Sequence, residues 1–129
     1  MARSELMVML TWHDKTVHNA IELFEECKDL DVTEWGFKNV GICEYDTVNL
    51  IHRMNEAGKR TNYEIITRNE EAYRYGEITA QRAKFKCMMG TKYDKQLHKA
   101  LKKEGIEFMP AVGQPGCVYN GEHGVMLGE

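Results

Sequence analysis

The sequence lacks the features that mark membrane-spanning, secreted or nucleic-acid-binding proteins. Its 129 residues carry a formal net charge of −3, so there is no basic excess to attract nucleic acid or an anionic membrane. No apolar run approaches the roughly 18 residues of a membrane-spanning helix. The N-terminal segment MARSELMVML has no signal-peptide apolar region followed by a cleavage site. We therefore expect a cytoplasmic protein with no nucleic-acid or membrane partner.

Cysteine is scarce, and no metal-binding pattern is present. The four cysteines are scattered, without a C-x-x-C pair, which is typical of a reducing compartment in which cysteines serve as small apolar side chains. His13 and His18 have poor spacing for two ligands on one helix face, and no third ligand is evident. We expect no metal and no cofactor.

The clearest structural unit is the segment Glu34–Lys59. Trp35–Val40 has the composition of a short strand and ends at Gly41. Asp46 can cap a following helix, whose apolar residues recur at helical spacing until Gly58. Because another strand-like run starts directly afterwards, this helix is expected to be a crossover between two parallel strands.

The same alternation continues through residues 1–112, followed by a glycine-rich tail at 113–129 without helix periodicity. The further expected strands are Leu6–Thr11, Thr61–Thr67, Phe85–Met89 and Ile106–Val112. The continuous apolar run of the first of these predicts a strand that is covered on both faces. The expected caps of the other helices are Asp14 or Thr16, Asn69, and Thr91 with Asp94.

Alternating strands and helices predict an α/β domain with a parallel sheet, for which two architectures compete. One is a TIM-barrel-like half barrel of about five strands and four helices. The other is a flavodoxin-like doubly wound sheet. The half barrel is favoured, because no helix follows the fifth strand to cover it. Since a half barrel has two unpaired edges, we expect a homo-oligomer that completes the barrel, or a tail that covers the edges.

Catalytic and binding residues of both architectures lie where the strands end. Lys38 and Glu64 fall on neighbouring strands and can meet as an ion pair. Such a lysine can be a Schiff-base nucleophile or a proton donor, with the glutamate as a general base. The alternatives are a structural salt bridge, or a lysine that extends past the strand end into water. His13 and Asp14 are further acid–base candidates, although Asp14 can be only a helix cap.

Two glycine-containing loops are candidates for ligand binding. Gly90 and Thr91 are expected to open the fourth helix, where backbone N–H groups and the positive helix end suit a phosphate group. The alternative is a plain N-cap threonine. Gly113 and Gln114 follow the fifth strand and form either a turn over a ligand or merely a turn.

Several segments together resemble a known family. They are MLTWHDKTVHNAIELFEE, WGFKNVG, YEIIT, MMGT and GIEFMPAVGQP. They resemble an uncharacterised bacterial family of small β/α-barrel proteins, similar in fold to the ribulose-phosphate-binding barrels that include the isomerase and cyclase of histidine biosynthesis. The resemblance covers nearly the whole chain, about the first half of a family member. The family's GFK and GT positions correspond to Gly36-Phe37-Lys38 and Gly90-Thr91.

The resemblance implies a TIM-type barrel that acts on a small phosphorylated or carboxylated metabolite. Barrels of that type usually hold phosphate after strands seven and eight, which this chain lacks. It therefore implies a fragment, a shortened form or a half that assembles with another, with doubtful activity in isolation.

Three function classes stay open. The first is a barrel half of the isomerase or lyase type, with Lys38 and Glu64 in catalysis. The second is a non-catalytic flavodoxin-like binding domain. The third is a self-assembling structural half barrel, in which Lys38 and Glu64 are merely paired. A phospho-receiver does not fit, because the third and fifth strands end without the required Asp and Lys.

Overall fold

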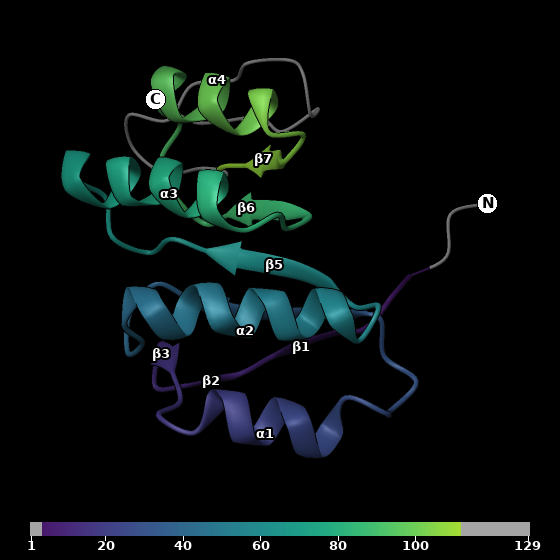
Figure 1. Cartoon of the computed structure of the whole chain (residues 1–129). Helices are drawn as coiled ribbons and strands as arrows, with labels where there is room; N and C mark the ends of the chain where they lie inside the picture. Colours follow the sequence, from purple (N-terminus) through teal and green to yellow (C-terminus); the bar gives the residue numbers. More distant parts are fainter. Residues whose placement is uncertain (1–3, 112–129) are drawn as a thin grey trace.

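The structure, a computed structural model, describes residues 4–111 (Figure 1). They form a five-stranded sheet, four helices and a two-stranded hairpin. The strands of the sheet are β1 (Met7–Met9), β4 (Glu34–Lys38), β5 (Arg60–Glu64), β6 (Cys87–Met89) and β7 (Glu107–Met109). The helices are α1 (Ala20–Cys27), α2 (Glu44–Glu56), α3 (Glu70–Arg82) and α4 (Lys95–Lys103). The hairpin consists of β2 (Thr11–Trp12) and β3 (Lys15–Thr16).

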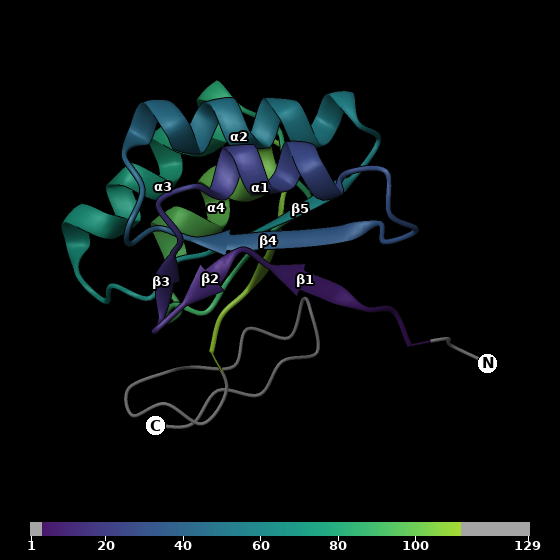
Figure 2. The same ribbon diagram turned by 90° about the horizontal axis from the view of Figure 1, so that it is seen from below.

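The strand order confirms an α/β fold built from βα units. All neighbouring strands are parallel, and their order is β1-β4-β5-β6-β7, so each strand lies beside the one that precedes it in the series. All four helices lie on the same side of the sheet (Figure 2). A flavodoxin-like sheet would instead have the order 2-1-3-4-5. The observed order is that of the half barrel.

The core lies between the helices and one face of the sheet. Trp35 and Phe37 point into it from β4, and both are fully buried. Phe24 of α1 meets Trp35 edge-on, with their ring centroids 5.2 Å apart. Tyr63 of β5 lies against Phe37, with a centroid distance of 5.1 Å. These aromatic contacts fix the first three βα units against one another.

The other face of the sheet, which no helix of the described part covers, is called the open face below. Because partners in a parallel ladder share a face, the register defines its residues in rows across the strands. The rows are Met7, Glu34 and Arg60; then Met9, Gly36, Asn62, Cys87 and Glu107; and then Lys38, Glu64, Met89 and Met109. Most charged strand residues are therefore on the open face.

Polar contacts compensate for a buried carboxylate at the amino-terminal end of this face. Glu34 is only 4% exposed, and it binds Lys86, Arg60 and Asn62. Burial raises the pKa of the Glu34 carboxyl, but the hydrogen bonds from Lys86 and Asn62, together with the positive charges of Lys86 and Arg60, outweigh it and leave this pKa lowered. This cluster connects β4, β5 and the start of β6.

Several expected boundaries at the start of the chain are wrong. The first strand is shorter than Leu6–Thr11 and lies at an edge of the sheet, where Met7 is exposed. The chain then turns through the β2–β3 hairpin rather than entering a helix. As a result, Asn19 rather than Asp14 or Thr16 precedes α1.

The other helix starts were predicted with mixed success. The Asn69 cap is confirmed, since its side chain accepts a hydrogen bond from Ala72 N at 2.8 Å. The Asp46 cap is wrong, because α2 begins at Glu44 after Cys43. The fourth helix is capped by Asp94, which was expected only as the partner of a Thr91 cap.

Candidate functional site

The carboxyl ends of β4 and β5 carry a cluster of three charged side chains. Lys38 and Glu64 are the last residues of these strands and are register partners. The Lys38 Nζ atom lies 3.6 Å from Glu64 Oε2 and also donates a hydrogen bond to Asp14 Oδ1. The predicted Lys38–Glu64 ion pair is therefore confirmed, and Asp14 joins it.

The β2–β3 hairpin brings Asp14 to this position. His13 and Asp14 form its two-residue turn, with φ angles of 50° and 63°. Positive φ at both central residues is characteristic of a type I′ hairpin turn. The hairpin is attached to β4 through buried Thr16, whose hydroxyl donates to Lys38 O at 2.7 Å and accepts from Lys38 N at 2.8 Å. The same contacts hold the Lys38 backbone in place.

The surroundings of Lys38 keep it protonated. The hydrogen bond to Asp14 raises the pKa of Lys38; burial opposes this, and the negative charge of Glu64 adds to it. Its side chain is 14% exposed, whereas those of Glu64 and Asp14 are 23% and 74% exposed. A charged ammonium can donate a proton or stabilise a negative oxygen, but it is not a nucleophile. The geometry therefore disfavours the Schiff-base alternative.

Gly90 makes room for Glu64. It has a φ of +85°, and a Cβ atom at this position would collide with the Glu64 side chain. Its N–H donates to Met109 O at 3.2 Å. Gly90 thus lies next to the charged cluster and helps to set the orientation of its carboxylate.

The prediction that Gly90-Thr91 opens the fourth helix is wrong. The helix α4 starts at Lys95, and the Asp94 carboxylate already accepts a hydrogen bond from Leu97 N at 2.7 Å. Thr91 is fully buried, so its side chain faces no solvent-accessible cavity. The predicted phosphate site depended on a helix N-terminus at these residues, and no helix starts there. Ligand binding at Gly90 and Thr91 remains a prediction.

The remaining predicted residues are not part of the charged cluster. The His13 side chain is exposed, and its ring meets Trp12 edge-on at a centroid distance of 4.7 Å. An acid–base role for His13 remains a prediction. Gly113 and Gln114 lie outside the described residues.

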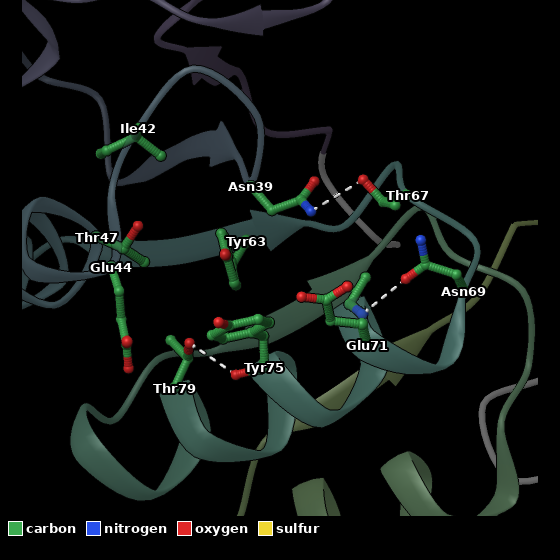
Figure 3. Close-up of a pocket in the computed structure, with 11 residues that line it drawn as sticks. Asn39, Ile42, Glu44, Thr47, Tyr63, Thr67, Asn69, Glu71, Tyr75 and Thr79 are labelled. Atoms are coloured by element: carbon green, nitrogen blue, oxygen red, sulfur yellow. Dashed lines mark hydrogen bonds between the residues drawn. The ribbon is translucent and has the colours of Figure 1, made fainter.

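A pocket of about 380 Å³ lies on the helix side of the same strand ends, between α2 and α3 (Figure 3). Its lining residues are Asn39, Ile42, Glu44, Thr47, Tyr63, Thr67, Asn69, Glu71, Ala72, Tyr75 and Thr79. The sequence pattern alone did not predict this pocket. The available indication was limited to Asn39 directly after β4, and to Thr67 and Asn69 within five residues of the end of β5.

Asn39 connects the pocket to the charged cluster, since it follows Lys38 directly. Its backbone N–H donates to Glu64 O at 2.9 Å. Its side-chain amide donates to Thr67 Oγ1 at 3.3 Å and accepts from Ile66 N at 3.0 Å. These bonds hold the chain segment after Glu64 against the end of β4, with charged groups on one side and the pocket on the other.

The buried hydroxyl of Tyr63 lies at the inner end of the pocket and stays protonated. Burial raises the pKa of Tyr63; a hydrogen bond with Thr47 lowers it, and the negative charge of Glu44 raises it further. The Tyr63 hydroxyl therefore acts as a neutral hydrogen-bonding group.

The described residues 4–111 contain no group of three His, Cys, Asp or Glu side chains that could hold a metal ion. In the same part of the chain, no helix has both the length and the apolar character needed to cross a membrane.

The fold and this site define an α/β protein with a singly wound parallel sheet and charged residues at its carboxyl edge. Comparisons with protein-family models, curated proteins and solved structures found no match. The resemblance to the small β/α-barrel family therefore stays a prediction.

Proposed function

We propose that this chain is half of a β/α-barrel-type enzyme that transfers a proton on a small carbonyl-containing metabolite. Glu64 is the general base and Lys38 the proton donor. The observation that carries the proposal is the Lys38–Glu64 pair, at the carboxyl ends of adjacent strands and on the open face. Catalytic residues of β/α-barrel enzymes occupy this end of the barrel.

The proposed step needs only these two side chains. The Glu64 carboxylate removes a proton from the carbon next to a carbonyl group, and negative charge develops on the carbonyl oxygen. The Lys38 ammonium donates a hydrogen bond or its proton to that oxygen. A charged donor aimed at a developing oxyanion is an effective way to lower the barrier of such a step. This chemistry is common to isomerases and lyases.

The charges favour a carboxylated over a phosphorylated substrate. Asp14 and Glu64 together carry two negative charges against the single positive charge of Lys38, which opposes binding of a phosphate dianion. Asp14 is highly exposed and sits on a two-residue turn, so a substrate carbonyl or carboxylate oxygen can replace it at Lys38. Lys38 would then exchange one oxygen partner for another.

The sheet edges support assembly with a second copy. Within residues 4–111, β1 and β7 each pair with only one neighbour. Leu6, Met7 and Met109 are large apolar side chains exposed at these two edges. Unpaired edges of this kind are prone to pair with another chain. We propose that two copies pair β1 with β7 and thereby enclose the charged cluster, with a dimer mass in light scattering as the expected result.

Hydrogen exchange tests the chemistry without knowledge of the complete reaction. Small 2-oxo acids and hydroxyketones, with and without phosphate, are incubated with the protein in D2O. Proton NMR then follows the signal at the carbon next to the carbonyl. We expect the protein to exchange this proton for deuterium in one of the carboxylated compounds. The exchange should be lost in Glu64→Gln and should decrease strongly in Lys38→Met. Glu107→Gln is the matched control, because Glu107 is an exposed carboxylate elsewhere on the open face.

Persistent exchange in Glu64→Gln would contradict the assigned base. Stable dimers without exchange on any compound would favour the second candidate, a self-assembling structural half barrel. A well-folded monomer would contradict the proposed assembly.

A further inference from the structure

We infer that the pocket between α2 and α3 is a binding site for a small organic cation, such as an amine with an aromatic or apolar stem. This site is separate from the proposed proton-transfer site, and its ligand class does not depend on that function. The pocket lies on the helix side of the sheet, whereas Lys38 and Glu64 lie on the open face.

The size and walls of the pocket suit a small molecule. Its volume of about 380 Å³ lies within the range of small-molecule sites. Tyr63 of β5 and Tyr75 of α3 provide ring surface, and Glu44 and Glu71 lie on two sides of it (Figure 3). The site thus combines aromatic surface with negative charge.

The charges of the lining select a cation. Among the described residues that line the pocket, only Glu44 and Glu71 are charged at neutral pH. The Glu44 carboxylate is paired with Arg82 at the surface. The exposed Glu71 side chain makes no hydrogen bond or ion pair with another described residue. Glu71 is therefore the carboxylate that is available to a ligand ammonium group.

The rings supply a second preference for positive charge. Tyr63 is held by the core through contacts with Phe37 and Phe85, at centroid distances of 5.1 Å and 5.8 Å. Tyr75 is 51% exposed, so core packing does not explain its large aromatic side chain. A cation over the face of a tyrosine ring is attracted by the ring's electron density. An amine in this pocket can contact a ring and a carboxylate together.

An anion is the opposite possibility, because the amino-terminal ends of α2 and α3 both open towards the pocket. Their first turns, however, carry the acidic residues Glu44 and Asp46 in α2 and Glu70 and Glu71 in α3. The N–H of Ala72 is also taken by the Asn69 cap. Negative side chains at helix starts stabilise the helix dipole without any ligand. Glu70 lies in the same first turn of α3 but pairs with Arg74 and does not line the pocket, so it is the control for a general effect of removing a carboxylate from this helix start.

Benzylamine is the probe, with benzyl alcohol as the neutral analogue and benzoate as the anionic one. Chemical-shift titrations of the isotope-labelled full chain at pH 7 give each dissociation constant. We expect benzylamine to bind at least about tenfold more tightly than either analogue, because only benzylamine supplies the cation. Its binding should weaken with added salt.

Variants locate the site. Glu71→Gln and Tyr75→Ala should each weaken benzylamine binding by about three- to tenfold, on the scale of one exposed charge or cation–π contact. Glu70→Gln should leave it unchanged. Glu64→Gln should also leave it unchanged, although it abolishes the proposed proton transfer, so the two proposals can fail separately. Equal binding of the three probes, tighter binding of benzoate, or equal effects of Glu70→Gln and Glu71→Gln would each overturn the inference.

Discussion

Phe37 and Lys38 are neighbours in the sequence, yet their side chains lie in opposite environments on the two faces of β4. Phe37 is fully buried between the sheet and the helices, with its ring against Tyr63. Lys38 points to the open face and is held by Asp14 and Glu64. The difference shows that the helix side of the strand supplies stability, whereas the open face carries groups that can react.

The same division extends across the sheet. The row that contains Phe37 continues through Tyr63, Met88 and Phe108, all of which are buried. The next row begins with Lys38 and Glu64 and ends at exposed Met109. Substitutions in these two rows are therefore expected to affect different properties of the protein.

The largest expected effect comes from Phe37→Ala. Removing a fully buried phenylalanine leaves a cavity and should lower the free energy of unfolding by about 3–5 kcal/mol. Lys38→Met should lower it by less than about 1 kcal/mol, because Asp14 and Glu64 remain accessible to water. Urea denaturation followed by circular dichroism measures both values.

The rate of proton exchange should depend on the two positions in the reverse order, with Lys38 more important than Phe37. Lys38→Met should remove most of the proton exchange while the protein stays folded. Phe37→Leu, which keeps an apolar side chain at the buried position, should retain both folding and exchange. Equal losses of stability in Phe37→Ala and Lys38→Met would contradict the division of roles between the two faces.

A smaller effect is expected from Gly90→Ala, with Gly58→Ala as its control. Both glycines have positive φ angles, of +85° and +72°, where an alanine is strained by about 1 kcal/mol. Nothing lies within 4 Å of the Cβ position at Gly58, whereas a Cβ at Gly90 would collide with Glu64. The free energy of unfolding should therefore fall by about 1 kcal/mol in Gly58→Ala and by about 2–3 kcal/mol in Gly90→Ala.

The source of that difference can be checked with a double variant. Glu64→Ala removes the side chain with which the new Cβ atom collides. In the background of Glu64→Ala, Gly90→Ala should therefore lower the urea midpoint only about as much as Gly58→Ala does. If the double variant is as unstable as the sum of both changes, Gly90 is required for a reason other than the space for Glu64.

The sequence was sufficient to predict the βα units and the Lys38–Glu64 pair. Strand alternation determines which residues share a face, and the parallel register places the two strand ends together. The Gly90-Thr91 helix start was wrong because Thr91 and Asp94 are both good cap residues. The deciding contact is that of the Asp94 carboxylate with Leu97 N, which a cap preference alone does not reveal.

Two parts of the site could not be predicted because they depend on contacts between distant segments. The β2–β3 turn uses His13 and Asp14 instead of the usual Asn-Gly or Asp-Gly pair, and its docking depends on Thr16 binding the backbone of Lys38. The pocket exists only because α2 and α3 pack at a particular separation over β5. The spacing of apolar residues along the chain reveals neither the docking of the hairpin nor the separation of α2 and α3.

The smallest expected effect is a loss of stability at alkaline pH, to which the two faces contribute for different reasons. Lys38 has a raised pKa because carboxylates stabilise its charged form, and Tyr63 has a raised pKa because burial penalises its charged form. In both cases the folded state binds the proton more tightly than the unfolded chain. Both contributions to stability are therefore complete below about pH 10, the ordinary range of these groups, and decline as the pH rises towards the folded pKa values.

Salt separates the two contributions. Added salt screens the Lys38 ion pairs near the surface, so the part of the alkaline decline that Lys38→Met removes should shrink at about 1 M NaCl. The part that Tyr63→Phe removes should persist, because burial of a hydroxyl inside the core does not depend on mobile ions. Urea midpoints between pH 8 and about 11 measure both parts. The chain has six tyrosines, so the difference in absorbance at 295 nm between the wild type and Tyr63→Phe is needed to follow the ionisation of Tyr63 alone. If salt reduces the two parts equally, the charge of Glu44 rather than burial is the main cause of the raised pKa of Tyr63, and the two faces differ less than the geometry indicates.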